Sequence, residues 1–236
     1  MIATFVNAGG PVQRAPHVYI AYWGNWWNST NVAATNAGWS YTPRDVRRYV
    51  TSFFAHIGAS SWSSVLRQYG TRGAQLRGAY VDTKPVPAHP TSAQIQSEAL
   101  RVAHHFRHMT PDTTVVVITS QGHDQRGNSA CGYHDLARSL PFIYLPYLPD
   151  MPRCGRNSVA ATAFGNGYMD GFSIIGGHEL AETQSDPLFT GWYDPAGKEV
   201  GDMCAWRAVA NVQVGGKSFA VQPLWSNKTQ SCEVAA

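Results

Sequence analysis

The sequence predicts a mixed α/β sheet followed by an irregular C-terminal lobe, and two observations lead to this prediction. Runs rich in β-branched and aromatic residues alternate with segments of helical periodicity through much of the chain. Beyond residue 187 the chain is instead rich in Gly, Trp and Asn. At 236 residues it has the length of one domain. We therefore expect a single α/β (α+β) domain over 1–236, with a sheet-and-helix part (1–169) and a late helix plus lobe (170–236).

The strands are expected where short apolar runs are bounded by turn residues. Three of them are His17–Gly24, Gln75–Val81 and Thr113–Thr119. The last is apolar throughout, which places it in mid-sheet with both faces covered. Leu140–Tyr147 is predicted to be an edge strand, because Pro141 and Pro146 cannot donate to a ladder. Short strands are also expected at Val209–Val214 and Phe219–Val221.

Three helices follow from capping residues and periodicity. The first lies within Tyr41–Gly58, after the cap Thr42. The second starts at Thr91, with Gln94 completing a capping box, and ends before Pro111. The third spans about Phe172 to Gln184, with Asp170 as its cap and Pro187 as its stop.

Composition excludes several classes of protein. Hydrophobic residues make up 44% and charged residues 14%, which is too apolar for a disordered chain. The net charge of +3 is spread thinly, so no nucleic-acid partner is expected. No apolar run reaches the length of about 18 residues that a membrane span needs. Residues 1–16 lack the pattern of a signal peptide, so we expect a soluble chain with no membrane contact that either begins inside the cell or is a mature form.

Four cysteines occur, none in a C-x-x-C pair. The pairing with the shortest loops is Cys131–Cys154 with Cys204–Cys232, although three connectivities are possible and four free thiols are the alternative. Disulfides occur mainly in oxidising compartments, so this pairing favours an extracellular protein. We expect it to be a monomer.

The acidic residues gather late in the chain. Seven of the fifteen lie between Asp170 and Asp202, where Lys198 is the only fixed positive charge. Such a surplus indicates that a cation lies nearby.

The sequence His178-Glu179-Leu180-Ala181-Glu182 falls on the third predicted helix. Residues four apart share a helix face, so His178 and Glu182 can aim a nitrogen and an oxygen at one point, with Glu179 beside it. This is the H-E-x-x-H metalloprotease pattern with Glu as the second ligand, and carboxylate oxygen is an acceptable zinc ligand. An ordinary helix with exposed acids is the alternative.

A third metal ligand is needed, and three carboxylates are candidates. We rank Asp202 first because Cys204 could hold it in place, and Glu199 second. Asp186 is third, because on a straight helix it would lie about 12 Å from His178.

Other candidates are weaker. His134 and His123 follow the central strand and could line a cleft, and we include His134, Trp192 and Tyr193 as candidate substrate-binding residues. His104 and His108 share a helix face but have Arg neighbours typical of a solvated surface. The aromatic run Tyr22–Trp27 could bind a glycan or peptide, or belong to the core.

Several blocks lie in order along the chain: Tyr22–Trp26, Val117–Ser120, Cys131–His134, His178–Glu182 with Asp186–Leu188, Gly191–Tyr193 and Glu199–Cys204. Together they resemble the exordium or phosphate-induced protein family, which comprises secreted plant proteins with bacterial and fungal relatives. The plant pattern has Asn at the position of Asp186, which favours Glu199 or Asp202 as the third ligand. The resemblance implies a secreted protein with a zincin-like site.

These inferences together predict a single zincin-like domain that binds one divalent ion, Zn²⁺ before other metals. We expect a secreted peptidase in which Glu179 is the general base for a metal-activated water, acting on peptides or proteins that include those of the cell wall. The alternative is a non-catalytic extracellular glycan-binding or signalling protein in which the ion is structural.

Overall fold

The computed structural model describes residues 4–107, 110–125, 127, 129–159 and 167–235. A five-stranded sheet lies at its centre, in the order β5-β2-β6-β8-β7. Neighbours among β5, β2, β6 and β8 are parallel, and β7 pairs antiparallel with β8. The mixed α/β prediction is therefore confirmed. The strands are β2 (His17–Trp23), β5 (Gln75–Asp82), β6 (Thr113–Thr119), β7 (Tyr133–Ala137) and β8 (Leu140–Leu145).

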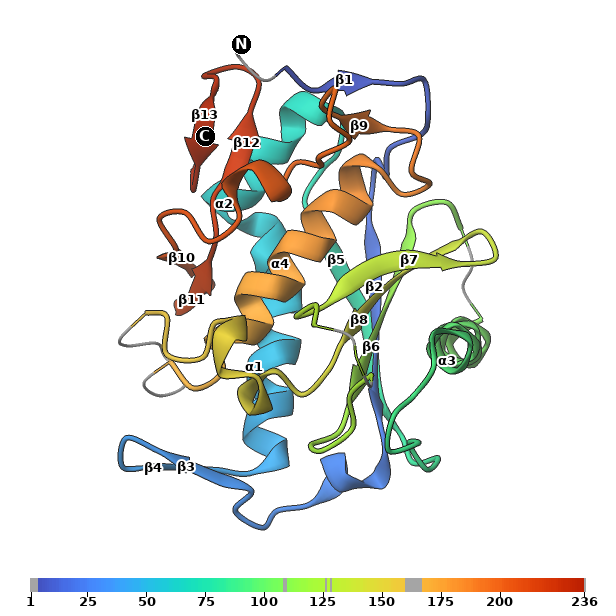
Figure 1. The fold of residues 1–236 in the computed structure, drawn as a ribbon, viewed down its shortest axis with the longest axis vertical. Helices are drawn as coiled ribbons and strands as arrows, with labels where there is room; N and C mark the ends of the chain where they lie inside the picture. The colour runs from blue at the N-terminus through green and yellow to red at the C-terminus, as the bar shows by residue number, and fades with distance from the viewer. Residues whose placement is uncertain (1–3, 108–109, 126, 128, 160–166, 236) are drawn as a thin grey trace.

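Helices cover both faces of this sheet (Figure 1). Helices α1 (Pro43–His56) and α4 (Asp170–Ser185) lie on one face, and α3 (Ser92–Phe106) lies on the other. The short α2 (Ser61–Ser64) follows α1. All three predicted helices are thus present, and Thr42 with Asp45 and Thr91 with Gln94 form capping boxes at the starts of α1 and α3.

The core has two layers because alternate strand residues point to opposite faces. In β2, Val18, Ile20 and Tyr22 belong to the cluster that includes residues of α1 and α4. Tyr19 and Trp23 belong to the cluster that includes residues of α3. Every residue of β6 is buried, which confirms its predicted place inside the sheet.

The predicted edge position of β8 is wrong. This strand lies between β6 and β7, and β7, which the sequence analysis did not identify, forms the edge. The prolines do not interrupt the parallel ladder. Its pairing with β6 begins at Phe142, after Pro141, and β8 ends at Leu145, before Pro146. A proline at the start of a strand or beyond its end withholds no N–H that the ladder needs.

Helix α4 is buried on all sides, with His178 its one residue that is not fully buried. It is therefore a central helix, and the alternative of an ordinary helix with exposed acids is wrong, because Glu179 and Glu182 are buried. At Gly176 and Gly177 a Cβ would lie 3.2–3.3 Å from Phe54 and Phe53 of α1. These glycines consequently allow the two helices to pack closely.

The predicted cap Asp170 is also corrected. It is the first residue of α4, and its Oδ2 accepts a hydrogen bond from the backbone N–H of Val159 rather than from the helix itself. The carboxylate therefore ties the preceding segment to the helix start.

The C-terminal region consists of small paired strands packed beside α4. The two short strands expected here are present as β10 (Ala210–Val214) and β11 (Lys217–Val221), which form one hairpin, and β12 (Leu224–Ser226) pairs with β13 (Ser231–Glu233). Further pairs are β1 (Val6–Asn7) with β9 (Trp192–Tyr193) and β3 (Ala34–Asn36) with β4 (Trp39–Tyr41).

Both predicted disulfides are present. Cys131 bonds to Cys154 and Cys204 bonds to Cys232, so no cysteine is free. Within the described part of the chain, no helix combines the length and the apolar composition that crossing a membrane requires.

Candidate metal centre

The helix α4 brings the two residues of the predicted pair together on one face. Nε2 of His178 lies 3.1 Å from Oε1 of Glu182, one helical turn away. The same nitrogen lies 3.8 Å from Oδ1 of Asp202. Asp202 begins the short 3-10 helix η6 (Asp202–Cys204). The three ligand atoms lie within 4.8 Å of one another, so the first-ranked third ligand of the sequence analysis is at the required place.

Backbone hydrogen bonds fix the loop that carries Asp202. Its N–H donates to Oε1 of Glu182 over 3.1 Å. Its Oδ2 accepts the N–H of Glu199 over 3.1 Å. The disulfide from Cys204 to Cys232 follows two residues later. The two hydrogen bonds and the nearby disulfide thus hold Asp202 beside α4.

Two further residues shape this group for an ion. A Cβ at Gly201 would lie 2.9 Å from Nδ1 of His178 and 3.0 Å from Oε1 of Glu182, so only glycine lets the loop come this close. The Nε2 atom of Gln222 lies 2.8 Å from Nδ1 of His178 and donates to the carbonyl of Gly201 over 3.0 Å. One imidazole nitrogen and two carboxylate oxygens are donors that Zn²⁺ accepts. These residues therefore fit a zinc ion.

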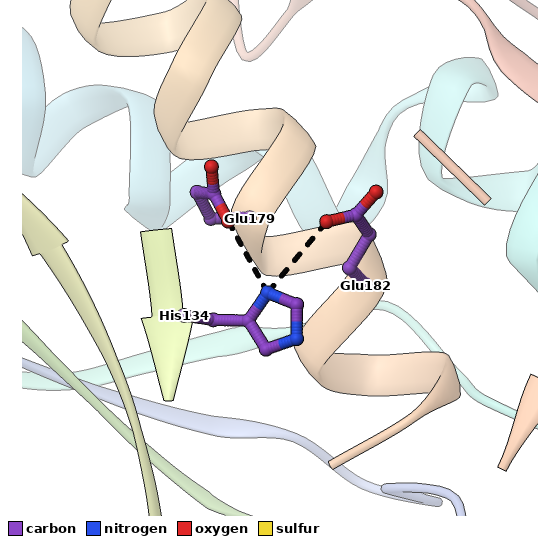
Figure 2. A group of neighbouring side chains, drawn as sticks. All are labelled: His134, Glu179 and Glu182. Carbon is purple, nitrogen blue, oxygen red and sulfur yellow. Dashed lines mark hydrogen bonds and ion pairs between the residues drawn. The ribbon is translucent and has the colours of Figure 1, made fainter. Parts of the chain in front are cut away.

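A second histidine faces the other side of Glu182. In Figure 2, His134 of β7 points toward Glu179 and Glu182 of α4. Its Nδ1 lies 3.2 Å from Oε2 of Glu179 and 3.6 Å from Oε2 of Glu182. The predicted general base and the predicted substrate-binding histidine are consequently in direct contact.

His134 is held in place from two directions. Its Nε2 lies 3.4 Å from Oε2 of Glu199, and its ring stacks on Phe189 with centroids 5.0 Å apart. Glu199 therefore faces His134 and lies outside the group around His178. Asp186, the third candidate, accepts the N–H groups of Thr190 and Gly191 over 2.6 Å each and caps the end of α4.

The carboxylates of the cluster favour the charged form of both histidines. Burial alone would lower the pKa of His178, but Glu182, with help from Glu179 and Asp202, raises it to about 10. Burial also opposes the charge on His134, yet Glu179 and Glu199 keep its pKa well above the ordinary value. Burial raises the pKa of Glu182 to about 7, although His178 opposes this effect.

Burial differs sharply across the cluster. The side chains of His134, Glu179 and Glu182 are 8%, 9% and 4% exposed, whereas that of Asp202 is 45% exposed. The cluster is therefore open to solvent on the side of Asp202.

Other predicted site residues lie elsewhere. Trp192 and Tyr193 form β9, which pairs with β1, and the ring of Trp192 packs against Tyr69. The Nδ1 of His123 lies 2.9 Å from the carbonyl oxygen of Pro87.

The structure places two further sequence candidates, one of them only in part. Trp27 is fully buried and Trp26 packs on it, which confirms the core interpretation of that aromatic run. His104 lies at the end of α3, and its companion His108 falls outside the described residues.

One cavity, of about 830 Å³, lies away from this cluster. It runs beside α1 and is lined by four basic side chains (Arg44, Arg47, Arg48 and Lys217) among other residues. None of the residues lining this cavity belongs to the candidate metal centre.

Sequence reasoning missed three residues of the site. Gly201 stands in the Glu199–Asp202 block and could have been noted as a place of close approach. Gln222 and Phe189 carry no motif that would have identified them.

Comparison with models of protein families, with curated proteins and with solved structures finds no match to this chain. The resemblance to the exordium family stays a prediction.

Proposed function

We propose that this protein is a secreted, zinc-dependent peptidase in which His178, Glu182 and Asp202 hold the ion and Glu179 is the general base. One observation carries the proposal. Glu179 lies next to His178 in the chain, stays outside the three-residue ligand group, and has one oxygen in contact with His134. A ligand group with an adjacent, buried and separately held carboxylate is the arrangement that metal-assisted hydrolysis requires.

The ion would polarise the scissile carbonyl and make a water molecule acidic enough to attack it. Glu179 would take the proton of that water and pass it to the leaving amine. Its Oε2 is occupied by His134, which leaves Oε1 for the proton transfer.

His134 and Glu199 would act as positioning residues. The contact of Glu199 with Nε2 orients the imidazole so that Nδ1 faces Glu179. The charge on His134 also offsets the negative charge that Glu179 and Glu182 place together.

The substitution Glu179→Gln tests the proposal. Protein loaded with one equivalent of Zn²⁺ is incubated with a mixed peptide library, and new termini are read by mass spectrometry. We expect cleavage by the native protein and a loss of at least about 100-fold in the variant, with zinc content unchanged. The control Glu233→Gln changes a half-buried carboxylate that belongs to neither ligand group, and it should cleave at the native rate.

The alternative is a non-catalytic extracellular protein with a structural ion, and the same experiment separates the two. Zinc binding with no cleavage by either protein would favour that alternative. Cleavage that survives Glu179→Gln would place the chemistry elsewhere. The extracellular location is itself part of the proposal, and the two disulfides support it.

A further inference from the structure

The two oxygens of Glu182 face two different histidines. Oε1 lies 3.1 Å from Nε2 of His178 and accepts the N–H of Asp202. Oε2 lies 3.6 Å from Nδ1 of His134. A carboxylate whose two oxygens face different metal-binding groups is placed as a bridging ligand would be.

The ligand atoms form two groups and not one. His178, Glu182 and Asp202 make the first, and His134, Glu179 and Glu182 make the second. Among the described residues, no group whose ligand atoms lie within 4.8 Å of one another contains both histidines. One ion therefore cannot take a ligand from each histidine, whereas two adjacent ions could share Glu182.

Charge favours a second ion. Four carboxylates meet here (Glu179, Glu182, Glu199 and Asp202), and their ion pairs in the described structure run to His134 and His178. When both imidazoles are neutral metal ligands, four negative charges remain. One divalent ion offsets two of them and a second offsets the other two.

His134 is oriented as a ligand of such an ion. Metal-bound histidines commonly direct the second ring nitrogen at a carboxylate, which fixes the ring and its tautomer. Here Nε2 faces Glu199 and leaves Nδ1 toward Glu179 and Glu182. The ring is buried and stacked on Phe189, so it has little freedom to turn away.

We propose that a second divalent transition-metal ion binds His134, Glu179 and Glu182, bridged to the first by Glu182, and that it switches off hydrolysis. Imidazole nitrogen with carboxylate oxygen selects zinc-like ions over calcium or magnesium. The ion takes the carboxylate that the proton transfer needs, so hydrolysis requires the second site to be empty. This inhibitory consequence rests on the proposed function, whereas the binding itself does not.

Titration of metal-free protein with Zn²⁺ tests the second site, with stoichiometry read by native mass spectrometry and affinity by calorimetry. We expect two ions, the second weaker because it shares Glu182 with the first. His134→Gln should bind one ion, with an affinity within about threefold of that of the native protein for its first ion. His89→Gln, an exposed histidine away from the cluster, should bind two. Saturation of the native protein at one ion, or two ions retained by His134→Gln, would overturn the proposal.

Two additions keep the test decisive. Glu179→Gln, which changes one oxygen to a nitrogen, should weaken only the second event at least about tenfold, and it checks the result if His134→Gln folds poorly. In the native protein, peptide cleavage should rise with the first equivalent of zinc and fall at least about tenfold as the second binds. A rate that stays at its maximum with two ions bound would contradict the inhibitory role. Two bound ions without any cleavage would refute the proposed function and leave the second site standing.

Discussion

Nδ1 of His134 lies 3.2 Å from Oε2 of Glu179, and this contact joins the edge strand of the sheet to the central helix. The strand β7 and the helix α4 are separated in sequence by more than 30 residues, yet they bring the proposed base and the histidine in contact with it together. The geometry of the candidate centre thus depends on how the sheet edge packs on α4.

His134→Gln should lower kcat for peptide cleavage by about 10- to 100-fold with little change in KM. The variant loses the charged imidazole that would orient Glu179. Removing a side chain that orients a residue of a metal site typically costs about 10- to 100-fold in activity. Steady-state rates at one equivalent of zinc measure the effect, with His89→Gln as the matched surface control. A kcat equal to that of the native protein would show that the contact has no catalytic role.

Gly201→Ala should weaken binding of the first zinc ion at least about tenfold. The added methyl group would press on both His178 and Glu182 at 2.9–3.0 Å, so the loop or the ligands must shift. Competition with a chelating dye gives the affinity. Lys198→Ala, on the exposed part of the same loop, is the control and should bind normally. Equal affinities for the two variants would mean that the close approach at Gly201 does not shape the site.

Each disulfide lies next to one half of the centre, so removing them should have different effects. Cys204 is two residues from Asp202, and Cys131 is three residues from His134. Each bond contributes on the order of 3–4 kcal/mol in the chain-entropy model. Cys204→Ser/Cys232→Ser should weaken the first zinc ion more than Cys131→Ser/Cys154→Ser does. The reverse order in a zinc titration would contradict this assignment.

Asp170→Asn should stabilise the fold more at neutral pH than at pH 4. Burial raises the pKa of Asp170 to about 7, so between pH 4 and 7 the native state keeps a proton that the unfolded chain has released. The free energy of unfolding therefore falls as pH rises through this window, by on the order of 2–4 kcal/mol. Asparagine has no charge to bury and can still accept the N–H of Val159.

Denaturant titrations of the native protein and the variant from pH 3 to 8 measure this difference. Asp45→Asn should change the stability of the protein in the opposite direction. Burial opposes the charge of Asp45, but hydrogen bonds from Thr42 outweigh it and lower the pKa of this carboxyl group. This substitution should therefore destabilise the protein at neutral pH and have less effect at pH 3. A pH-independent effect of Asp170→Asn would exclude a buried, titrating carboxyl group.

Local signals predicted most of the regular elements. The capping boxes at Thr42 and Thr91 and the apolar run of β6 gave the helices and the inner strand correctly, because these depend on neighbouring residues. The place of β8 in the sheet was wrong, because strand order depends on contacts far apart in sequence. The pairing of His178 with Glu182 followed from helix geometry alone.

The remainder of the centre required tertiary structure. Nothing local shows that His134 of β7 packs on α4, or that Gln222 reaches Nδ1 of His178. The sequence ranked Asp202 ahead of Glu199 as a ligand, but it could not show that the turn they share sends one to each histidine.

The central claim is that His178, Glu182 and Asp202 hold a divalent ion, and a crystal grown with Zn²⁺ tests it most directly. Anomalous difference density measured at the zinc absorption edge should show a peak about 2.0–2.2 Å from Nε2 of His178 and from a carboxylate oxygen of Glu182. The peak should disappear in His178→Gln. Zinc density confined to surface histidines such as His89, with none between these three side chains, would contradict the account.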